Sequence, residues 1–455
     1  MSAAEPGFHV VIIGAGTGGL CLAQGLRRAG ISVAVYERDT ARTRDEGLQG
    51  YRVGIDPDGS RALHACLPPQ LFDILVATCA RPPEYSNVLT ERRAEILSTG
   101  GWAGPPGADP VSSEKSVSRM TLRQVLLTGL EDIVHFGKTF TRYEPDGQKV
   151  TAFFADGTTA TGTTLVAADG TGSAVRRQYL PGARLEDTGI ISIGGKAPLT
   201  AQTRALLTPK MLHGLSLILA PKGYGAVIYA MEFPWDTDGA PKTGIGSTDA
   251  SLIARWPGLA FDNTRDYITI GFAGAAKRLP AGVMDLKAPE LHQLITELTR
   301  TWHPDLRQLI ALADPLSFFP INIRTSVPVP QWQTTNVTLI GDAIHTMTPG
   351  RGVGANTALR DARLLSQKLT AARGGQVPLL TAIRDYETQM TGYGFDAVRK
   401  SRKQMTARNP IYTPVTGRAL LATMRTMMRI INHIPAAKNA MARSERADRG
   451  HDRQD

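Results

Sequence analysis

The sequence predicts a mixed α/β fold, in which a parallel-sheet domain is interrupted by a second β-sheet domain and followed by C-terminal helices. Three observations predict this fold. A strand, a glycine turn and a helix occupy residues 9–38, a second unit of the same kind occupies residues 337–362, and β-rich runs lie between them over residues 185–275. A sheet domain inserted into a parallel-sheet domain produces this order of elements.

The first unit reads VVIIGAGTGGLCLAQGLRRAG, followed by ISVAVYER. The apolar run predicts a buried strand, and Leu20, Ala23 and Leu26 recur at helical spacing after it. The turn between them has the spacing GxGxxG, in which the first glycine permits a tight turn, the second admits a pyrophosphate and the third allows close helix packing. The helix N-terminus adds free N–H donors for phosphates. The unit therefore predicts a Rossmann-like nucleotide site with the turn residues Gly14, Ala15, Gly16, Thr17, Gly18 and Gly19.

Glu37, followed by Arg38, ends the second strand of this unit, 18 residues after Gly19. A carboxylate at that place accepts hydrogen bonds from ribose hydroxyls and repels a 2′-phosphate. The expected ligand is therefore FAD or NAD(H), and not a tightly held NADP.

The second unit reads VTLIGDAIHTMTPGRGVGANTALRDA. It is expected to bind a part of the cofactor that FAD has and NAD lacks. NAD needs the first unit alone, whereas the longer FAD needs a second strand end for its ribityl chain and flavin ring. Asp342 is the expected ligand of the ribityl hydroxyls, and the glycines of 349–356 allow backbone to approach a flat ring. Donors at the start of the next helix would stabilise negative charge on reduced flavin, and they are expected at Gly354, Ala355 and Asn356. His345 is expected to be a packed, hydrogen-bonded residue and not a base.

Four segments resemble, in order and approximate spacing, the class A flavoprotein monooxygenases of the para-hydroxybenzoate hydroxylase type. They are GAGTGG with Glu37–Arg38, RMTLRQVLL, AADGTGSAVRR and GDAIHTMTPGRGVGAN, and the resemblance covers residues 9 to about 370. It implies a Rossmann-like FAD-binding domain interrupted by a β-sheet substrate domain. It also implies that Arg119 reaches the flavin side, that Asp169 and Gly170 form the Asp-Gly motif of FAD and nicotinamide binding, and that the ring loop contains Pro349, Gly352, Val353 and Gly354. Val353 replaces a glutamine that many relatives carry, and Ala167 replaces a glycine.

The activity that the resemblance implies is that of an FAD-dependent monooxygenase, with NADH or NADPH as a transient co-substrate. Through a flavin C4a-hydroperoxide it would hydroxylate or epoxidise a bulky aromatic or unsaturated small molecule. The chemistry would be centred on the flavin, so no catalytic side chain is assigned; Arg52, His213 and Tyr229 are the candidates for contact with substrate. Three alternatives stay open: a reductase or dehydrogenase of the same fold, a non-catalytic flavin- or ligand-binding protein, and a flavin halogenase, although its WxWxIP motif is absent.

The predicted domains are discontinuous. The FAD-binding domain comprises 1–70, 116–182 and 318–373, the substrate-binding sheet domain comprises 71–115 and 183–317, and a helical region with a basic, disordered end (441–455) comprises 374–455. Residues 71–115 are expected to be irregular, with a loop at 100–110. Two hairpins are expected, one within 149–170 and one joining LHGLSLILA to GAVIYAMEF.

The net charge of +10 does not indicate a nucleic-acid partner, because residues 397–455 hold 13 Lys/Arg against 4 Asp/Glu and so carry an excess of 9. The basic residues lack a groove-reading motif. Three scattered cysteines and dispersed histidines indicate neither a disulfide framework nor a metal site. Without a signal peptide or a long apolar run, a cytoplasmic monomer or homodimer is expected.

The segment 417–435 is amphipathic. Arg418, Arg425 and Arg429 fall on one predicted helical face. The opposite face contains Leu420, Leu421, Met424, Met427, Met428 and Ile431. The segment is either a terminal helix packed on the substrate domain or a site of weak contact with a membrane surface.

Overall fold

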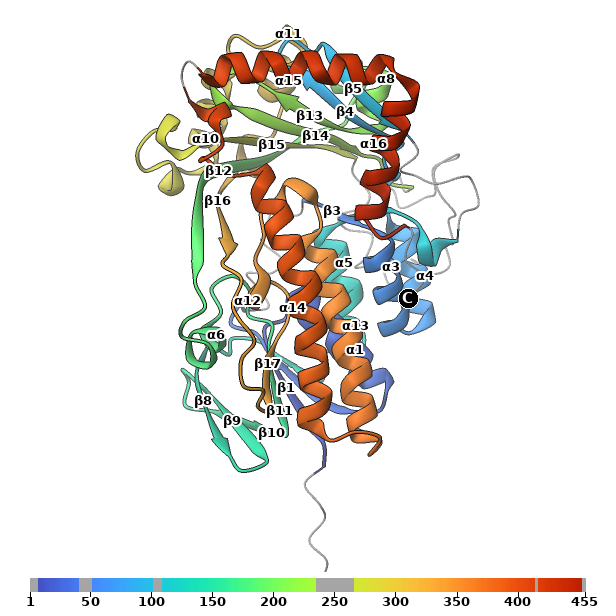
Figure 1. Ribbon diagram of the computed structural model, residues 1–455, viewed down its shortest axis with the longest axis vertical. Coiled ribbons are helices and arrows are strands. Elements are labelled where there is room, and N and C mark those ends of the chain that lie inside the picture. Colours follow the sequence, from blue (N-terminus) through green and yellow to red (C-terminus); the bar gives the residue numbers. More distant parts are fainter. Residues whose placement is uncertain (1–6, 41–50, 101–108, 235–265, 414–415, 452–455) are drawn as a thin grey trace, which may run out of the picture.

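The chain forms two main β-sheets, each with its own hydrophobic core. The computed structural model describes residues 7–40, 51–100, 109–234, 266–413 and 416–451. Figure 1 shows the parallel sheet and its helices in the lower half of the molecule and the larger sheet in the upper half.

The parallel sheet holds five strands in the order β17-β11-β1-β2-β7. The strands are β17 (Val337–Leu339), β11 (Thr164–Ala167), β1 (His9–Ile13), β2 (Ser32–Tyr36) and β7 (Val134–His135). Almost every residue of β1, β11 and β17 is buried, as the apolar runs predict. Because these three strands are parallel neighbours, their carboxyl ends meet at one edge of the sheet.

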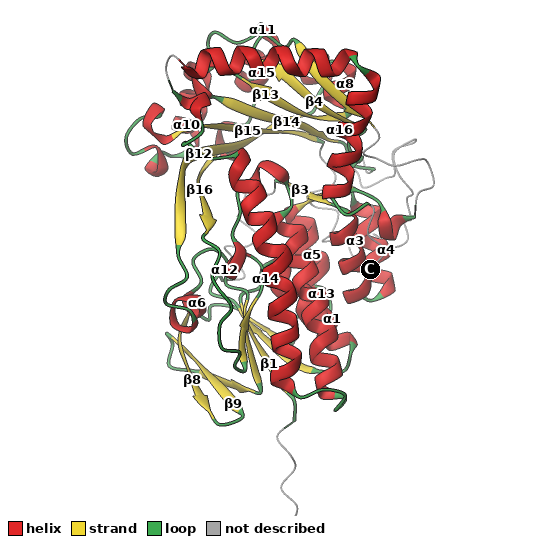
Figure 2. Cartoon of the chain, viewed as in Figure 1, coloured by secondary structure: helices red, strands yellow, loops and turns green. Residues whose placement is uncertain are grey.

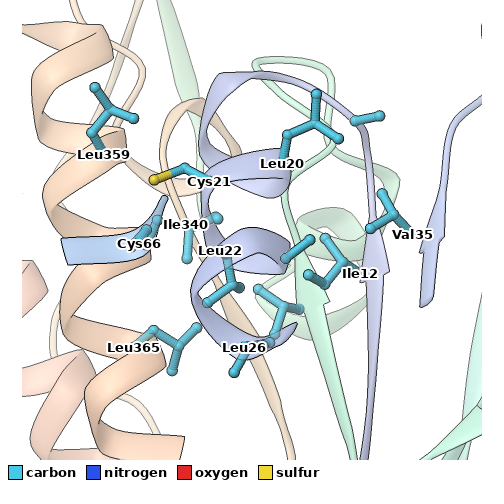
Figure 3. Close-up of a cluster of buried hydrophobic side chains, with 14 of the residues drawn as sticks. Ile12, Leu20, Cys21, Leu22, Leu26, Val35, Cys66, Ile340, Leu359 and Leu365 are labelled. Atoms are coloured by element: carbon cyan, nitrogen blue, oxygen red, sulfur yellow. The ribbon is translucent and has the colours of Figure 1, made fainter. Parts of the chain in front are cut away.

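Helix α1 (Thr17–Arg28) packs between this sheet and α13 (Gly354–Arg373). Figure 3 shows Leu20, Leu22 and Leu26 of α1 between strand residues such as Ile12 and the α13 side chains Leu359 and Leu365. Each of the three α1 leucines is fully buried, and burial of one such side chain contributes about 1.5–3 kcal/mol. Helices α3 (Pro57–Cys66) and α14 (Leu379–Gln404) also pack against α13, and Figure 2 shows α13 and α14 side by side.

The larger sheet holds seven strands in the order β16-β12-β15-β14-β13-β4-β5. The strands are β16 (Phe319–Ser326), β12 (Leu185–Pro198), β15 (Tyr267–Ala275), β14 (Gly225–Met231), β13 (Gly214–Leu219), β4 (Tyr85–Thr90) and β5 (Glu95–Gly100). All neighbours are antiparallel except β13 and β4. One face packs against α10 (Ala288–Leu298) and α11 (Pro304–Ala311) in the second core.

Two smaller sheets and several helices complete the fold. Strands β3 (Arg52–Ile55) and β6 (Lys115–Ser118) form an antiparallel pair, and β8 (Phe140–Asp146), β9 (Lys149–Phe154) and β10 (Thr159–Gly162) form a meander. The remaining α-helices are α4 (Pro69–Thr78), α5 (Arg119–Leu127), α6 (Ala174–Tyr179), α7 (Ala201–Ala205), α8 (Pro209–Leu212) and α12 (Asp342–His345). The expected hairpins are confirmed as β9–β10 and β13–β14.

The expectation that residues 71–115 are irregular is wrong, because α4, β4 and β5 lie there, and two segments lie outside their expected domains. Helix α4 packs in the core of the parallel sheet, because its sequence PQLFDILVAT is apolar almost throughout. Strands β4 and β5 follow it and join the larger sheet. Strand β16 pairs with β12 in that sheet, although 318–373 was expected in the FAD-binding domain. Of the expected loop at 100–110, residues 101–108 lie outside the described residues.

The chain ends in two helices, α15 (Thr416–His433) and α16 (Pro435–Asp448). Helix α15 contacts β5, the edge strand of the larger sheet, where Asn432 Oδ1 accepts a hydrogen bond from Ser98 N at 3.2 Å. Figure 1 shows α16 descending from α15 toward α3. The predicted disorder of 441–455 is wrong for residues 441–451, because α16 continues to Asp448 and both Arg449 and Gly450 are buried.

The packing of α15 on the substrate sheet agrees with the first interpretation of its sequence, but the predicted faces are wrong. Arg425 turns toward the protein and forms an ion pair with Glu91. Leu421 is buried, whereas Leu420 and Met427 are 40% and 60% exposed. Within the described part of the chain, no helix has the length and apolar character needed to cross a membrane.

Candidate cofactor and substrate site

The glycine turn after β1 is shaped by steric limits. Gly14 has φ +107°, and a Cβ on it would lie 2.4 Å from the carbonyl oxygen of Ala168. A Cβ on Gly19 would lie 2.1 Å from the carbonyl oxygen of Gly14. At Gly16, by contrast, no described atom lies within 4 Å of that position. The fold itself thus requires Gly14 and Gly19, while Gly16 leaves open the approach that a pyrophosphate uses, at the start of α1.

Glu37 lies at the carboxyl end of β2, beside this turn. Its carboxylate accepts hydrogen bonds from Ala15 N at 2.7 Å and Asp39 N at 3.0 Å, and it lies 3.9 Å from Arg123 Nη2. These contacts fix a mostly buried carboxylate where the ribose ligand is expected. Arg38 instead is exposed, with Nε 3.6 Å from Asp39 Oδ1.

The second glycine unit lies directly beside the first. Ile340 N donates to Ala167 O at 2.9 Å, which continues the pairing of β17 with β11. A Cβ on Gly18 would lie 3.4 Å from both Ile340 Cδ1 and Ala358 Cβ, so the first turns of α1 and α13 are in contact. The arrangement predicted for one long cofactor, with two strand ends side by side, is therefore present.

Asp342 follows this strand end and begins α12. Asp342 is exposed to water, although many protein groups lie around it. The surrounding protein raises the pKa of Asp342, and the charges of His345 and Arg119 oppose that rise. The carboxylate is therefore accessible at this strand end. There it can accept hydrogen bonds from the hydroxyls of a ligand.

A buried carboxylate on α13, Asp361, holds the turn before Asp342. It accepts hydrogen bonds from Gly341 N at 2.7 Å, His345 Nε2 at 2.6 Å and Tyr393 OH at 2.6 Å. Burial lowers the pKa of His345, but the charge of Asp361, its hydrogen bond to the ring and the charge of Asp342 together outweigh this effect, and the net shift is upward. The expectation that His345 is packed and hydrogen-bonded is confirmed. Sequence reasoning missed Asp361, although a charged residue on the buried stripe of an amphipathic helix is a usable signal.

The Asp-Gly motif follows β11, the middle of the three strand ends. Asp169 Oδ2 accepts a hydrogen bond from Ala174 N at 2.8 Å, while its Oδ1 is buried without a partner among the described residues. Gly170 has φ +73°, with no described atom within 4 Å of its Cβ position. Arg176, which sequence reasoning did not single out, donates to Ala343 O at 2.7 Å and so ties this motif to α12.

The ring loop leads into α13. Pro349 begins a 3-10 turn, η7 (Pro349–Arg351), Gly352 is left-handed with φ +64°, and Val353 directly precedes the helix. The side chain of Asn356 braces this loop: Nδ2 donates to Gly352 O at 3.2 Å and to Gly54 O at 2.9 Å. The first backbone N–H groups of a helix, here those of Gly354 and Ala355, have no intrahelical partner and remain available as donors.

Arg119 lies on the same side of the molecule as Asp342. It begins α5, its backbone N donates to Tyr51 O at 3.0 Å, and its guanidinium lies 5.2 Å from the Tyr51 ring centroid. Its charge lowers the pKa of Asp342. The ring of Tyr51 in turn stacks on Phe319 of the larger sheet, with centroids 6.2 Å apart. Arg119 and Tyr51 therefore join the cofactor side to the larger sheet.

Two of the three substrate candidates, Arg52 and Tyr229, are in contact. The Arg52 guanidinium lies 4.2 Å from the Tyr229 ring centroid, and its Nε donates to Ser116 Oγ at 3.0 Å. Ser116 Oγ lies 2.9 Å from Tyr229 OH, which donates to Arg81 O at 2.7 Å. His213 is not part of this group: it follows α8, and its ring lies 3.9 Å from the carboxylate of Glu84.

The residues fit a dinucleotide held across two glycine units. Gly16 and Gly170 leave open backbone, Asp169 Oδ1 lacks a partner among the described residues, and Asp342 is exposed at the strand end. The fold and site thus define a flavoprotein of the type that spans one FAD from the end of β2 to the start of α13.

Comparisons with known proteins identify the family. Residues 289–390 match a model of an FAD-binding domain, and residues 12–65 match a model of an NAD(P)-binding Rossmann-like domain. A crystal structure of a protein described as an FAD-containing monooxygenase, from Photorhabdus luminescens, is 33% identical with a TM-score of 0.74. The match covers 88% of this chain and 98% of that one.

Two further relatives agree. A dual O-methyltransferase/FAD-dependent monooxygenase of Cercospora beticola is 32% identical over 400 residues, which are 84% of this chain. The chain spans 44% of the length of that relative. An FAD-dependent urate hydroxylase of Klebsiella pneumoniae is 27% identical over 409 residues, which are 87% of this chain and 89% of that protein. The chain belongs to the FAD-dependent monooxygenases, and FAD is its cofactor.

Proposed function

We propose that this protein uses NADH or NADPH and O2 to hydroxylate or epoxidise a bulky aromatic or unsaturated small molecule. The observation that carries the proposal is the contact between the two glycine units, together with the contact between Arg52 of β3 and Tyr229 of the larger sheet. Bound FAD supplies the hydride acceptor and the activation of oxygen. Membership of the monooxygenase family supports this reaction class.

The protein's part at the cofactor is to bind and to stabilise charge. Glu37 binds the ribose hydroxyls, and the N-terminus of α1 binds the pyrophosphate beside Gly16. Asp342 binds the ribityl hydroxyls. The N–H groups at the start of α13 would donate toward the flavin ring and would stabilise the negative charge of its reduced form. Asp169 and Gly170 complete the cofactor-binding surface.

The substrate is proposed to lie on the face of the larger sheet that is turned away from α10 and α11. Paired residues share a face, so the register places one lateral row on this side. The row consists of Phe319, Gly194, Gly271, Val227 and Leu217. Leu217 is 39% exposed, and Gly271 leaves room above the sheet, because the atom nearest to a Cβ there would be Val227 Cβ at 3.9 Å, whereas the Phe319 ring covers Gly194. An apolar face of this kind, bordered by Tyr51 and Phe319, suits a flat ring or an unsaturated chain.

Arg52 is proposed to bind an oxygen atom of the substrate. Its Nη2 is buried and has no hydrogen-bond partner within the described ranges. Tyr229 OH donates its only proton in a hydrogen bond to Arg81 O, so Ser116 Oγ must be the donor to Tyr229 OH. Arg52 Nε in turn donates to Ser116 Oγ. Burial raises the pKa of Tyr229. Tyr229 is therefore assigned to positioning Arg52, and not to removing a proton from a phenol.

The proposal places the protein in the cytoplasm, supported by the three free cysteines Cys21, Cys66 and Cys79. Its partners are small molecules, and the state of assembly, monomer or homodimer, is left open. A reductase or dehydrogenase of the same fold, or a protein that only binds flavin, would need the same cofactor residues. Activity must therefore separate these alternatives.

The test follows NADH and NADPH oxidation by the FAD-loaded protein with a panel of phenolic and polyene compounds, in ¹⁸O₂. Stimulated oxidation with ¹⁸O in the product is the expected result. Stimulated oxidation without incorporation would indicate a reductase, and no oxidation with any compound would indicate a binding protein.

The same assay tests the substrate site. Arg52→Gln is expected to raise KM about tenfold or more, the factor that 1.4 kcal/mol represents, with FAD content unchanged. The matched control is His213→Gln, which is expected to leave KM unchanged. An effect of His213→Gln equal to that of Arg52→Gln would contradict the assignment.

A further inference from the structure

The side chain of Arg449, close to the end of the described chain, is buried against a buried carboxylate. Its Nε donates to Glu114 Oε1 at 2.5 Å, and its Nη2 donates to Glu114 Oε2 at 2.8 Å. The side chains are 10% and 0% exposed. A bidentate pair of this kind is directional, and each partner needs the other because neither charge has access to bulk water.

The third nitrogen of the same guanidinium reaches the ring loop. Arg449 Nη1 lies 3.5 Å from Arg351 O, and a Cβ on Gly352 would lie 3.9 Å from that nitrogen. Arg449 therefore packs against the turn from which α13 starts. Asn356 holds the same turn from within the helix through its bond to Gly352 O.

Gly450 and His451, which follow Arg449, also make close contacts with the protein around them. Gly450 is left-handed with φ +80°, and a Cβ on it would lie 2.6 Å from the carboxylate carbon of Asp58. Its carbonyl accepts a hydrogen bond from Arg61 Nη2 at 3.0 Å. His451 Nε2 lies 3.4 Å from Glu114 Oε1. A basic residue on a loose tail would show none of these contacts.

The two C-terminal helices connect this contact to the larger sheet. Asn432 of α15 and Glu445 of α16 both bond to β5, the latter through Thr99 Oγ1 at 3.3 Å. The same helix pair thus binds the edge of the substrate-bearing sheet at one place and the ring loop at another.

We propose that Arg449 is a positioning residue for the cofactor: by joining Glu114 to the loop 349–354, it fixes the backbone N–H groups that face the flavin ring. The inference rests on the proposed contact between that loop and the flavin. Arg449 itself does not touch the cofactor.

The test compares Arg449→Met with Arg446→Met in the full chain. Arg446 is exposed on the last turn of the same helix, so its replacement controls for loss of charge. For Arg449→Met, the Kd for FAD is expected to rise about tenfold, which corresponds to 1.4 kcal/mol. The midpoint potential of the bound flavin is expected to become more negative, because donors that stabilise the anionic reduced form are less well fixed. Arg446→Met is expected to change neither quantity.

Two further variants keep the test decisive. Arg449→Lys retains a positive charge but cannot form the bidentate pair. Glu114→Gln retains the shape of the acceptor but loses its charge. Both variants are expected to make the midpoint potential of the bound flavin more negative. If Arg449→Met has the Kd for FAD and the midpoint potential of the wild type, the inference is overturned and the proposed function still stands. Where the Met variant does not fold, Arg449→Lys takes its place in this comparison. Failure of the wild-type chain to bind FAD would overturn both.

Discussion

The carboxylate of Asp361 accepts a hydrogen bond at 2.7 Å from the backbone N of Gly341, 20 residues earlier in the chain. Gly341 directly precedes Asp342, the proposed ribityl ligand. Asp361 is fully buried and lies on α13, where it also bonds to His345 and Tyr393. A side chain on another helix thus helps to determine where the carboxylate that is proposed to bind the ribityl chain stands.

Asp361→Asn is expected to destabilise the apoprotein by about 3–5 kcal/mol at pH 6, the cost of removing one partner of a buried ion pair. The net rise in the pKa of His345 stabilises the wild type at low pH, and this contribution is lost as pH rises through the raised pKa. The difference between variant and wild type should therefore shrink at alkaline pH. Urea unfolding at several pH values measures it. Asp396→Asn, at a half-exposed pair with Lys400, is the control, with an expected effect of about 0.5 kcal/mol.

Gly16→Ala and Gly19→Ala should separate cofactor binding from folding. At Gly19 the new methyl would meet Gly14 O at 2.1 Å, and a loss of about 3 kcal/mol or more in apoprotein stability is expected. At Gly16 the φ of −79° suits alanine and no described atom is near, so apoprotein stability should change by less than about 0.5 kcal/mol. The same methyl should nevertheless lower FAD affinity. Normal FAD binding by Gly16→Ala would refute the proposed pyrophosphate position.

Glu37→Gln and Asp342→Asn should act on different ends of the cofactor. Glu37 is proposed to bind the adenosine ribose, which FMN lacks, so its replacement should weaken FAD about tenfold (1.4 kcal/mol) and leave FMN unchanged. Asp342 is proposed to bind the ribityl chain, which both flavins contain, so its replacement should weaken both. Fluorescence titrations of each variant with FAD and FMN make the comparison. Equal loss of FMN affinity in the two variants would reverse the assignment.

Asp56 should make the chain less stable as pH rises. Burial raises the pKa of Asp56 to about 7, whereas the nearby charge of Arg449 lowers it. The folded protein therefore binds a proton that the unfolded chain releases, and stability falls between about pH 4 and pH 7 by up to about 4 kcal/mol, at 1.4 kcal/mol per unit. Asp56→Asn keeps the N-cap oxygen that accepts from Gly59 N. The variant should lose that pH dependence, and parallel wild-type and variant curves across this range would contradict the assignment.

The exposed side chains of α15 predict weak contact with a membrane surface. Met427 and Ile430 are 60% and 55% exposed, although the same helix contacts β5 and buries Leu421. Binding to anionic vesicles is expected in a flotation assay, and Met427→Gln with Ile430→Gln should reduce it. Ala422→Gln, at another exposed position of the helix, is the control. Recovery of the wild type only in the unbound fraction would end this interpretation.

The parts of the site that the sequence predicted follow from local rules. Gly14 and Gly19 are fixed by contacts between neighbouring backbone segments, and the GxGxxG spacing encodes those contacts directly. The hairpins and the strand that precedes Asp342 follow from short apolar runs bounded by turn residues. Expectations of this kind need no knowledge of which distant segments meet.

The parts that the sequence did not predict depend on such meetings. Asn356 was expected to offer a backbone donor, but its side chain joins the ring loop to β3, about 300 residues earlier in the chain. The partner of Arg449 is Glu114, which no local pattern connects to a basic C-terminal segment. The position of β16 was missed for the same reason, because its partner β12 decides its sheet.

The strand order β17-β11-β1 has a consequence for the time at which the protein becomes functional during synthesis. The glycine turn after β1 is translated long before β17, which ends at Leu339, and before α13, which ends at Arg373. A ribosome-bound chain of 300 residues therefore exposes one side of β11 as an unpaired edge, open to pairing with other chains. Cofactor capture has to wait until α13 has emerged, and a chain that stops before β17 would carry half a binding site and an aggregation-prone strand.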